Sequence, residues 1–331
     1  MRHFSRAKRR QTLVFATAML TLGSATSCFA QDKWPSRQVT IVVPFTAGGT
    51  TDVVARLVGQ KLGELWGQSV VIDNRQGAGG SIGSSIVAKS PADGYTILMA
   101  SGSILTVNPH LYKSLPFDVK KDFAPITNVA AGPMVVVVAN SVKANDLKSF
   151  IDLAKKHPKT INFGSAGLGS QVHMAGENFS HAAQIDLTHV PYRGEAAAYT
   201  DLMAGQIEAV VGNIGAITSL VNSGRIKALA VTGQERSPML PNVPTVAESG
   251  IPGFESYGWF GFIAPTGTPS AVIDKIQNDT VKVLAMPDIK KRLAEQGMNP
   301  VGDTPQEFVK AIDDESIKWA KIIKDRKLSI E

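Results

Sequence analysis

The sequence predicts an α/β protein built from two lobes of similar plan. Three observations support this prediction: β-branched apolar runs alternate with glycine-rich turns and helices, the same plan recurs in the second half, and 331 residues allow two domains. Hydrophobic residues form 44% of the chain and charged residues 19%, which is enough apolar material for a core in each lobe. Alternating strands and helices favour parallel strands, and ligands bind beyond the carboxyl ends of such strands.

The first strand, turn and helix occupy residues 39–59. The residues Val39, Ile41, Val42 and Val43 are β-branched and apolar without polar alternation, as expected for a strand covered on both faces. Ala47-Gly48-Gly49 then leaves backbone N–H groups free to turn inward, and Thr50 or Thr51 can cap the helix that follows. Free amides at the positive end of a helix dipole favour an anion, although a plain turn with a well-placed cap would use the same residue types.

The remaining elements follow in order along the chain. Before residue 132 we predict strands at 69–72 and 95–100, a helix at 82–88, and loops at 74–81 and 101–103. After it we predict strands at 134–139, 161–163, 187–190, 208–211 and 228–231, with helices at 147–156, 171–179 and 195–203. The aromatic run 257–262 is expected in the core between the lobes rather than as a stacking platform. Helices are predicted at 271–284, 288–296 and 305–324.

Residues 1–30 have the layout of a secretory signal, with a basic start, a short apolar core and small residues before the cleavage site. We expect cleavage after Ala30, so that the mature chain begins at Gln31 and is exported to the periplasm. Cys28, the only cysteine, could instead carry the lipid of a lipoprotein, but Ala25 stands where such signals prefer a large aliphatic residue. The mature chain has no disulfide in either case.

The net charge of +6 belongs largely to this segment. Without it, 29 basic residues face 28 acidic ones, which removes the main support for nucleic-acid binding. No dinucleotide or P-loop motif is present, and the histidines do not combine with acids at metal-ligand spacing. We therefore expect no cofactor and no metal.

One short segment matches the signature of a serine hydrolase. Residues 79–83 match G-x-S-x-G, which would make Ser81 a nucleophile if it followed a strand directly and had histidine and acid partners. Several loop residues separate Ser81 from the predicted strand, and no later histidine has a distinctive context. Because of these two departures, an exported serine hydrolase that uses Ser81 is only the alternative hypothesis.

Each of three polar residues allows more than one interpretation. His173 could face a ligand or be structural. Asp52 could stabilise the helix dipole, fix the loop or meet a ligand ammonium. Arg193 lies between a strand and a helix, where it could grip a carboxylate or form a surface salt bridge. Two lobes that each offer a helix N-terminus suit hinge closure around one small anion better than most single-site catalysts.

The mature chain contains seven distinctive segments in order: WPSRQVTIVVPFTAGGTTD, DNRQGAGGSIG, ADGYTILMAS, NFGSAGLGSQVHMAGE, VPYRGEAAAYTDLMAG, LPNVPTVAESGIPGFE and GFIAPTGTP. Together they resemble the tripartite tricarboxylate transporter substrate-binding proteins, the Bug family. The resemblance implies a type II periplasmic-binding-protein fold, with two lobes that each hold a central mixed sheet flanked by helices and a ligand cleft between them. Lobe 1 would comprise 31–132 with 256–331, and lobe 2 would comprise 133–255.

The resemblance also implies a function without catalysis: capture of a small carboxylate and its delivery to a membrane permease, by a monomer that binds no nucleic acid. A dicarboxylate, tricarboxylate, acidic amino acid or aromatic acid would each satisfy the anchoring site, and the receptor could serve sensing instead of uptake. Arg193 would favour a second negative group.

The residues that the resemblance assigns to the ligand come from both lobes. Lobe 1 would contribute Phe45, Ala47, Gly48, Gly49, Thr50, Asp52, Gly80, Ser81 and Ser101. Lobe 2 would contribute Ser165, Gly169, Ser170, His173, Tyr192, Arg193, Gly194 and Asn213. Family members hold one carboxylate through backbone amides and ordered waters. Ala47 departs from the proline that many relatives have there, which softens the loop and leaves its two glycines in place.

Overall fold

The computed structural model describes residues 34–330. The predicted signal peptide, its cleavage site and Cys28 lie outside these residues. Residues 34–36 do not belong to the compact unit that begins at Arg37, and this unit holds the helices and strands named below. Between residues 34 and 330, no helix has both the length and the apolar character needed to cross a bilayer.

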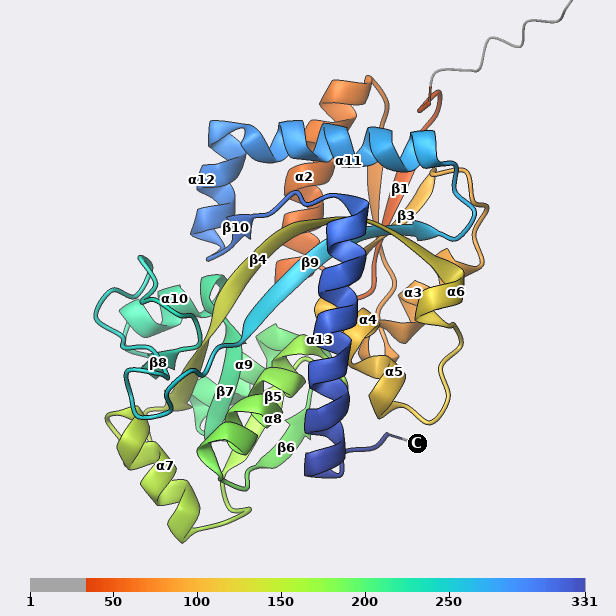
Figure 1. Ribbon diagram of the computed structural model, residues 1–331. Helices are drawn as coiled ribbons and strands as arrows, with labels where there is room; N and C mark the ends of the chain where they lie inside the picture. Colours follow the sequence, from red (N-terminus) through yellow and green to blue (C-terminus); the bar gives the residue numbers. More distant parts are fainter. Residues whose placement is uncertain (1–33, 331) are drawn as a thin grey trace, which may run out of the picture. The chain divides into compact units, whose positions relative to one another are not determined.

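Strands and helices alternate along most of the chain (Figure 1). The strands are β1 (Val39–Val43), β2 (Val70–Asn74), β3 (Thr96–Ser101), β4 (Phe123–Ala139), β5 (Asn162–Ser165), β6 (Thr188–Pro191), β7 (Ala209–Asn213), β8 (Ile226–Val231), β9 (Tyr257–Pro265) and β10 (Asn299–Pro300). The longer helices are α2 (Thr50–Trp66), α3 (Ser81–Ala88), α7 (Leu147–Lys156), α8 (Gln171–Ala183), α9 (Glu195–Ala204), α10 (Ile214–Asn222), α11 (Ser270–Ala285), α12 (Pro287–Glu295) and α13 (Pro305–Arg326). Shorter helical turns are η1 (Ala78–Gly80), α4 (Gly102–Thr106), α5 (Asn108–Leu111) and α6 (Val119–Asp122).

The sheet is mixed, with the strand order β2-β1-β3-β9-β4-β7-β5-β6 and with β8 and β10 also paired to β4. Within the strand–helix units the pairing is parallel, as the sequence predicts: β1 pairs with β2 and β3, and β5 pairs with β6 and β7. The strands β4 and β9 run antiparallel to their neighbours, which the alternation of strands and helices did not indicate.

β4 is the strand that both halves of the sheet share. Its first part pairs with β9 as far as Pro133, and its second part pairs with β7 and β8 from Met134 or Val135 onward. Figure 1 shows β4 and β9 as two long curved strands that run side by side through the molecule. One buried hydrophobic cluster surrounds the second part of β4, and another lies around β3, β9 and α13. The sheet therefore has two halves that share β4, and each half has its own hydrophobic cluster.

Most element positions agree with the sequence predictions, and α7 agrees at both ends because Asp146 begins it with a capping box. The start of α2 differs from the prediction. Thr50 is already helical and Gly49 is the N-cap residue, with no side-chain cap, so neither Thr50 nor Thr51 caps this helix. The predicted strand 134–139 is the end of the longer β4, and the aromatic run forms most of the largely buried β9.

Candidate functional site

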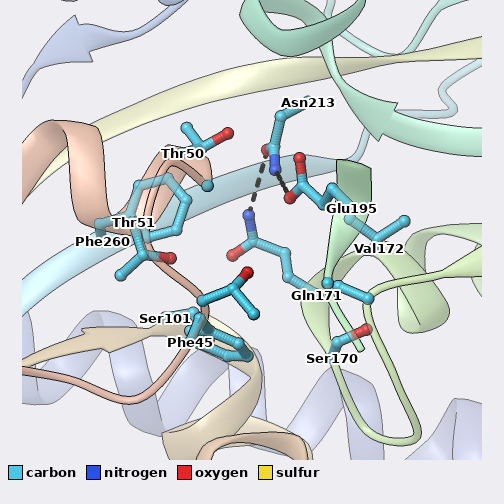
Figure 2. A pocket seen from close by; sticks show the side chains of 14 residues that line it. Phe45, Thr50, Thr51, Ser101, Ser170, Gln171, Val172, Glu195, Asn213 and Phe260 are labelled. Carbon is cyan, nitrogen blue, oxygen red and sulfur yellow. Dashed lines mark hydrogen bonds between the residues drawn. The ribbon is translucent and has the colours of Figure 1, made fainter. Parts of the chain in front are cut away.

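Two cavities that share lining residues lie where loops leave the carboxyl ends of β1, β3, β5, β6 and β7. The inner cavity measures about 30 Å³ and is lined by Phe45, Thr46, Gly49, Thr50, Thr51, Ser101, Ala166, Ser170, Gln171, Val172, Gly194, Glu195, Asn213 and Phe260 (Figure 2). The outer cavity measures about 590 Å³ and is lined by Phe45, Thr46, Gln76, Gly77, Ala78, Gly79, Gly80, Tyr112, Ala166, Gly167, Leu168, Pro191, Tyr192, Arg193, Gly194 and Ile330. The inner cavity has room for one small group, and the outer cavity has room for the rest of a larger molecule.

Four helices begin at the inner cavity. Thr50, Gln171 and Glu195 are the first residues of α2, α8 and α9, and Asn213 is the N-cap residue of α10. The side chain of Ser170 caps α8, whereas α2, α9 and α10 have no side-chain cap. Unsatisfied N–H groups and the positive ends of helix dipoles favour an anion in this space.

The predicted residues of lobe 1 divide between the cavities and the structure behind them. Phe45, Gly49, Thr50 and Ser101 line the inner cavity, and Gly80 lines the outer one. Ala47, Gly48, Asp52 and Ser81 line neither cavity. Ala47 and Gly48 are exposed on the loop, whereas Asp52 and Ser81 are buried.

Asp52 fixes the loop before α2. Its Oδ2 accepts hydrogen bonds from the Gly48 N–H at 2.9 Å and from Arg56 Nε at 2.9 Å, and its Oδ1 accepts one from Asn74 Nδ2 at 3.0 Å. Burial alone would raise the pKa of Asp52, but the hydrogen bonds from Arg56, Gly48 and Asn74 outweigh it and lower the pKa. Of the readings that the sequence allowed for Asp52, the geometry favours a loop-fixing role.

Ser81 begins α3, but its surroundings are not those of a nucleophile. Its hydroxyl is buried and has no hydrogen-bond partner within residues 34–330. A serine nucleophile needs a base within hydrogen-bond reach and access to a substrate. No group of histidine and acidic side chains that could hold a metal occurs in the same part of the chain.

The predicted residues of lobe 2 also divide into two sets. Ser170, Gly194 and Asn213 line the inner cavity, and Tyr192, Arg193 and Gly194 line the outer one. Ser165, Gly169 and His173 lie behind these walls and line neither cavity.

Two histidines support the loop between β5 and α8. His173 Nδ1 accepts a hydrogen bond from the Gly169 N–H at 3.2 Å, and Ser165 Oγ lies 2.6 Å from His189 Nε2. The two imidazole rings stack with 3.8 Å between their centroids. Burial lowers the pKa of His173 to about 3 and that of His189 to about 4, so both rings are neutral at pH 7. Of the two readings of His173, the geometry favours the structural one.

Several lining residues had no distinctive signal in the sequence, among them Gln171 and Glu195. Glu195 follows Gly194 in the first turn of α9, where an acid commonly stabilises the helix dipole, so its type and position did not single it out. Its Oε1 accepts a hydrogen bond from Asn213 Nδ2, and its Oε2 accepts one from the Tyr199 hydroxyl at 3.2 Å. Burial raises the pKa of Glu195 to about 7, although hydrogen bonds from Asn213, Tyr199 and Thr50 oppose the rise.

Gln171 connects the inner cavity to β9. Its Oε1 accepts a hydrogen bond from the Trp259 N–H at 3.2 Å, and its Nε2 lies 3.5 Å from Asn213 Oδ1. Figure 2 shows the Gln171 amide pointing toward the amide of Asn213 and the carboxylate of Glu195. This side chain therefore reaches from α8 to the long strand that crosses the molecule.

Loops from the two halves of the sheet approach each other closely at two glycines. A Cβ atom on Gly194 would lie 2.6 Å from Thr46 Oγ1. A Cβ atom on Gly79 would lie 2.5 Å from the Leu168 carbonyl oxygen, which also accepts a hydrogen bond from the Tyr112 hydroxyl at 3.2 Å. These contacts enclose the cavities between the two loop systems.

Comparison with known proteins gives consistent matches over most of the chain. A family model described as tripartite tricarboxylate transporter family receptor matches residues 54–328. Protein BugT of Bordetella pertussis is 36% identical over 317 residues, covering 96% of this chain and 97% of BugT. The structure of R. palustris Rpa4515 with adipate has a TM-score of 0.85 and 38% identity, covering 89% of this chain and 99% of that one. MatC from Rhodopseudomonas palustris, with bound malate, has a TM-score of 0.83 and 30% identity, covering 88% of this chain and 100% of that one.

Proposed function

The chain belongs to the tripartite tricarboxylate transporter receptor family, and from this premise we propose that it is a solute-binding receptor for a small carboxylate. The ligand is held between the lobes and delivered to a tripartite tricarboxylate-type membrane permease. The observation that carries the proposal is the convergence of four helix N-termini, three of them without a side-chain cap, on one small cavity. The relatives with adipate and with malate support a carboxylate as the ligand.

The proposal divides the mature chain into lobe 1, residues 31–132 with 256–331, and lobe 2, residues 133–255. The change in the pairing of β4 after Pro133 and the separate hydrophobic clusters support this division. Hinge closure at β4 and β9 would bring the loops of both lobes onto the ligand. The receptor is exported to the periplasm by its signal peptide and acts as a monomer.

The two cavities have different roles in this proposal. One ligand carboxylate occupies the inner cavity, against backbone N–H groups and the hydroxyls of Thr50 and Ser101. The remainder of the ligand occupies the outer cavity, where Arg193 is the one cationic side chain among the described lining residues. Catalysis is not part of the function, because a receptor needs only reversible closure and Ser81 lies outside both cavities.

A thermal-shift screen tests the receptor function directly. The refolded, ligand-stripped mature chain is heated with acetate, succinate, malate, adipate, citrate, glutamate and benzoate, and with the uncharged amide of each acid. At a hundredfold excess over the dissociation constant, a true ligand adds about 2.7 kcal/mol to the free energy of unfolding, or roughly 4 °C in Tm. A rise with acids alone, without their consumption, supports the receptor. Consumption of an ester or amide substrate by the unaltered chain but not by Ser81→Ala would instead identify a serine hydrolase.

Arg193→Ala is expected to weaken binding of dicarboxylates selectively. Arg193 is exposed at the outer cavity, and no acidic side chain within residues 34–330 pairs with it. Loss of a charge-assisted hydrogen bond costs about 1.5–3 kcal/mol, so the affinity for adipate should fall about ten- to hundredfold. Calorimetric titration should show little change for hexanoate, which lacks the second carboxylate, and Arg193→Lys should retain part of the affinity. Undiminished binding of every acid by Arg193→Ala would remove Arg193 from the site.

A further inference from the structure

Glu195 is an unusual residue for the wall of a carboxylate site. It is the one acidic side chain among the described residues that line either cavity, and no lysine or arginine lines the inner cavity with it. In Figure 2 its carboxylate lies beside the amide of Asn213 and faces the same space as Thr50 and Gln171. A ligand carboxylate anchored at the helix N-termini would therefore meet a second carboxyl group.

The groups around Glu195 are neutral on every side. Tyr199 is the titratable partner on its own helix, and burial together with Glu195 raises the pKa of that phenol well above its ordinary value. The neighbours from α2, α8 and β7 are Thr50, Gln171 and Asn213, which carry no charge. No ion pair to Glu195 occurs within the described part of the chain, residues 34–330.

Two carboxyl groups in so small a space cannot both be ionised without a large repulsive energy. In water-excluded sites such pairs share a proton, and one of the two groups binds it far more tightly than a lone carboxyl does. The hydrogen-bond pattern of Glu195 permits this: Asn213 and Tyr199 donate to different oxygens, Thr50 donates a third bond, and a protonated carboxyl oxygen can still donate one.

We propose that Glu195 binds the ligand in its protonated form and donates a hydrogen bond to the anchored carboxylate, so that ligand capture takes up one proton from solvent. The inference rests on the proposed receptor function and adds one condition for binding: the inner cavity accepts a carboxylate only together with a proton. Burial favours the protonated form of Glu195 already in the free protein, which prepares the site for an anion. The helix N-termini stabilise the charge that the shared proton leaves on the pair.

The pH dependence of binding follows from the raised pKa of Glu195. Glu195 is protonated below its pKa of about 7 and becomes ionised as the pH rises through that value. The ligand's own carboxylates, with pKa values near 4 to 5, are ionised throughout the range above about pH 6. The dissociation constant is therefore expected to stay level between about pH 6 and about pH 7 and to rise about tenfold per pH unit above it.

Calorimetry on the unaltered mature protein tests the proposal without any variant. Succinate, malate, adipate and benzoate are titrated in two buffers of different ionisation enthalpy, and the difference in heat counts protons. We expect uptake approaching one proton per ligand above about pH 8. Binding of an acid without proton uptake, at an affinity independent of pH, would overturn the role of Glu195 and leave the receptor intact. Failure of every acid to bind at any pH would overturn both proposals.

Glu195→Gln is the matched variant, because the amide keeps the shape and cannot ionise. We expect it to bind the same acids with a pH-independent affinity and without proton uptake. Glu235→Gln removes a charge from an exposed glutamate outside both cavities and should behave like the unaltered protein. A folded Glu195→Gln protein that binds no acid at any pH would contradict the proposal and make ionised Glu195 the acceptor for a ligand ammonium or hydroxyl group.

The ligand-free protein provides a second measurement. A glutamate whose pKa is raised in the fold stabilises the protein below the pKa of the unfolded chain and loses that contribution as the pH rises through the folded value. The Tm of Glu195→Gln should therefore increase relative to that of the unaltered protein between about pH 5 and about pH 8. A constant difference in Tm across this range would show that Glu195 is not held protonated and would overturn the proposal.

Discussion

Gly79→Ala is expected to weaken ligand affinity by about ten- to hundredfold while the protein remains folded. The new Cβ atom would lie 2.5 Å from the Leu168 carbonyl oxygen and 2.8 Å from the Tyr112 hydroxyl. Leu168 belongs to the opposite proposed lobe, so the clash with its carbonyl oxygen occurs only when the lobes are closed. The Tyr112 hydroxyl belongs to the same proposed lobe as Gly79 and is the far end of a side chain that can shift. The variant should shift the equilibrium toward the open form. Surface plasmon resonance should show most of the loss of affinity as a faster rate of ligand dissociation.

Gly67→Ala separates this effect from backbone strain. Gly79 has φ +59 and Gly67 has φ +64, so an alanine is strained at either position, but nothing lies within 4 Å of a Cβ atom at Gly67. Both variants should lose about 1 kcal/mol or more of stability, and only Gly79→Ala should lose affinity. Equal affinity in the two variants would mean that the contact between Gly79 and Leu168 does not form in the ligand-bound state.

The parts of the fold that the sequence predicts well are those with local causes. The strand β1 has an unbroken run of β-branched residues, and α7 has an amphipathic pattern that begins at the capping residue Asp146. Each of these signals lies within a few residues of the element that it specifies. The recurrence of the strand, loop and helix plan then predicted two lobes, and the family resemblance provided their proposed boundaries.

The parts that the sequence did not reveal depend on distant partners. Residues 123–133 of β4 contain two prolines and a glycine, so they lack a strand pattern, and they become a strand by pairing with β9, more than 120 residues away. The helix α10 was also missed: it is short, it has no side-chain cap, and only Gly212 and Asn213 separate its apolar residues from those of the strand β7.

The candidate site divides in the same way. Glycine- and serine-rich loops after strands are visible in the sequence, and they supplied Gly49, Ser101 and Ser170. Which side chain of a loop faces a cavity depends on how two loop systems meet, so Glu195 and Gln171 were missed while His173 and Asp52 were included. The latter two hold the loops in place through hydrogen bonds that sequence spacing alone could not distinguish from ligand contacts.

Arg326→Ala is expected to reduce the free energy of unfolding by about 3 kcal/mol, or roughly 5 °C in Tm. Arg326 ends α13, and its Nε and Nη2 donate to Glu177 Oε2 on α8 at 3.0 and 2.9 Å. The Glu177 side chain is only 5% exposed. The other basic side chain near Glu177 is His173, 3.9 Å away and neutral at pH 7. Removal of Arg326 therefore leaves a buried carboxylate without a cation.

The pH dependence of this loss identifies its cause. Burial raises the pKa of Glu177 and Arg326 opposes the rise, so the pKa should climb further in the variant. A raised pKa means that stability declines as the pH increases, and the loss should be larger at about pH 8 than at about pH 5, by thermal unfolding. Glu177→Gln in the same chain should restore most of the stability, because a neutral amide costs far less to bury than an unpaired carboxylate.

An exposed ion pair serves as the control. Arg236 and Glu248 are joined at 2.9 Å, but their side chains are 48% and 47% exposed, so Arg236→Ala should cost less than about 1 kcal/mol at either pH. If Arg326→Ala lost no more than Arg236→Ala, water would be replacing the guanidinium at Glu177. A large loss that Glu177→Gln failed to relieve would instead trace the effect to the packing of the Arg326 stem between α13 and α8, because the unpaired carboxylate would then be absent.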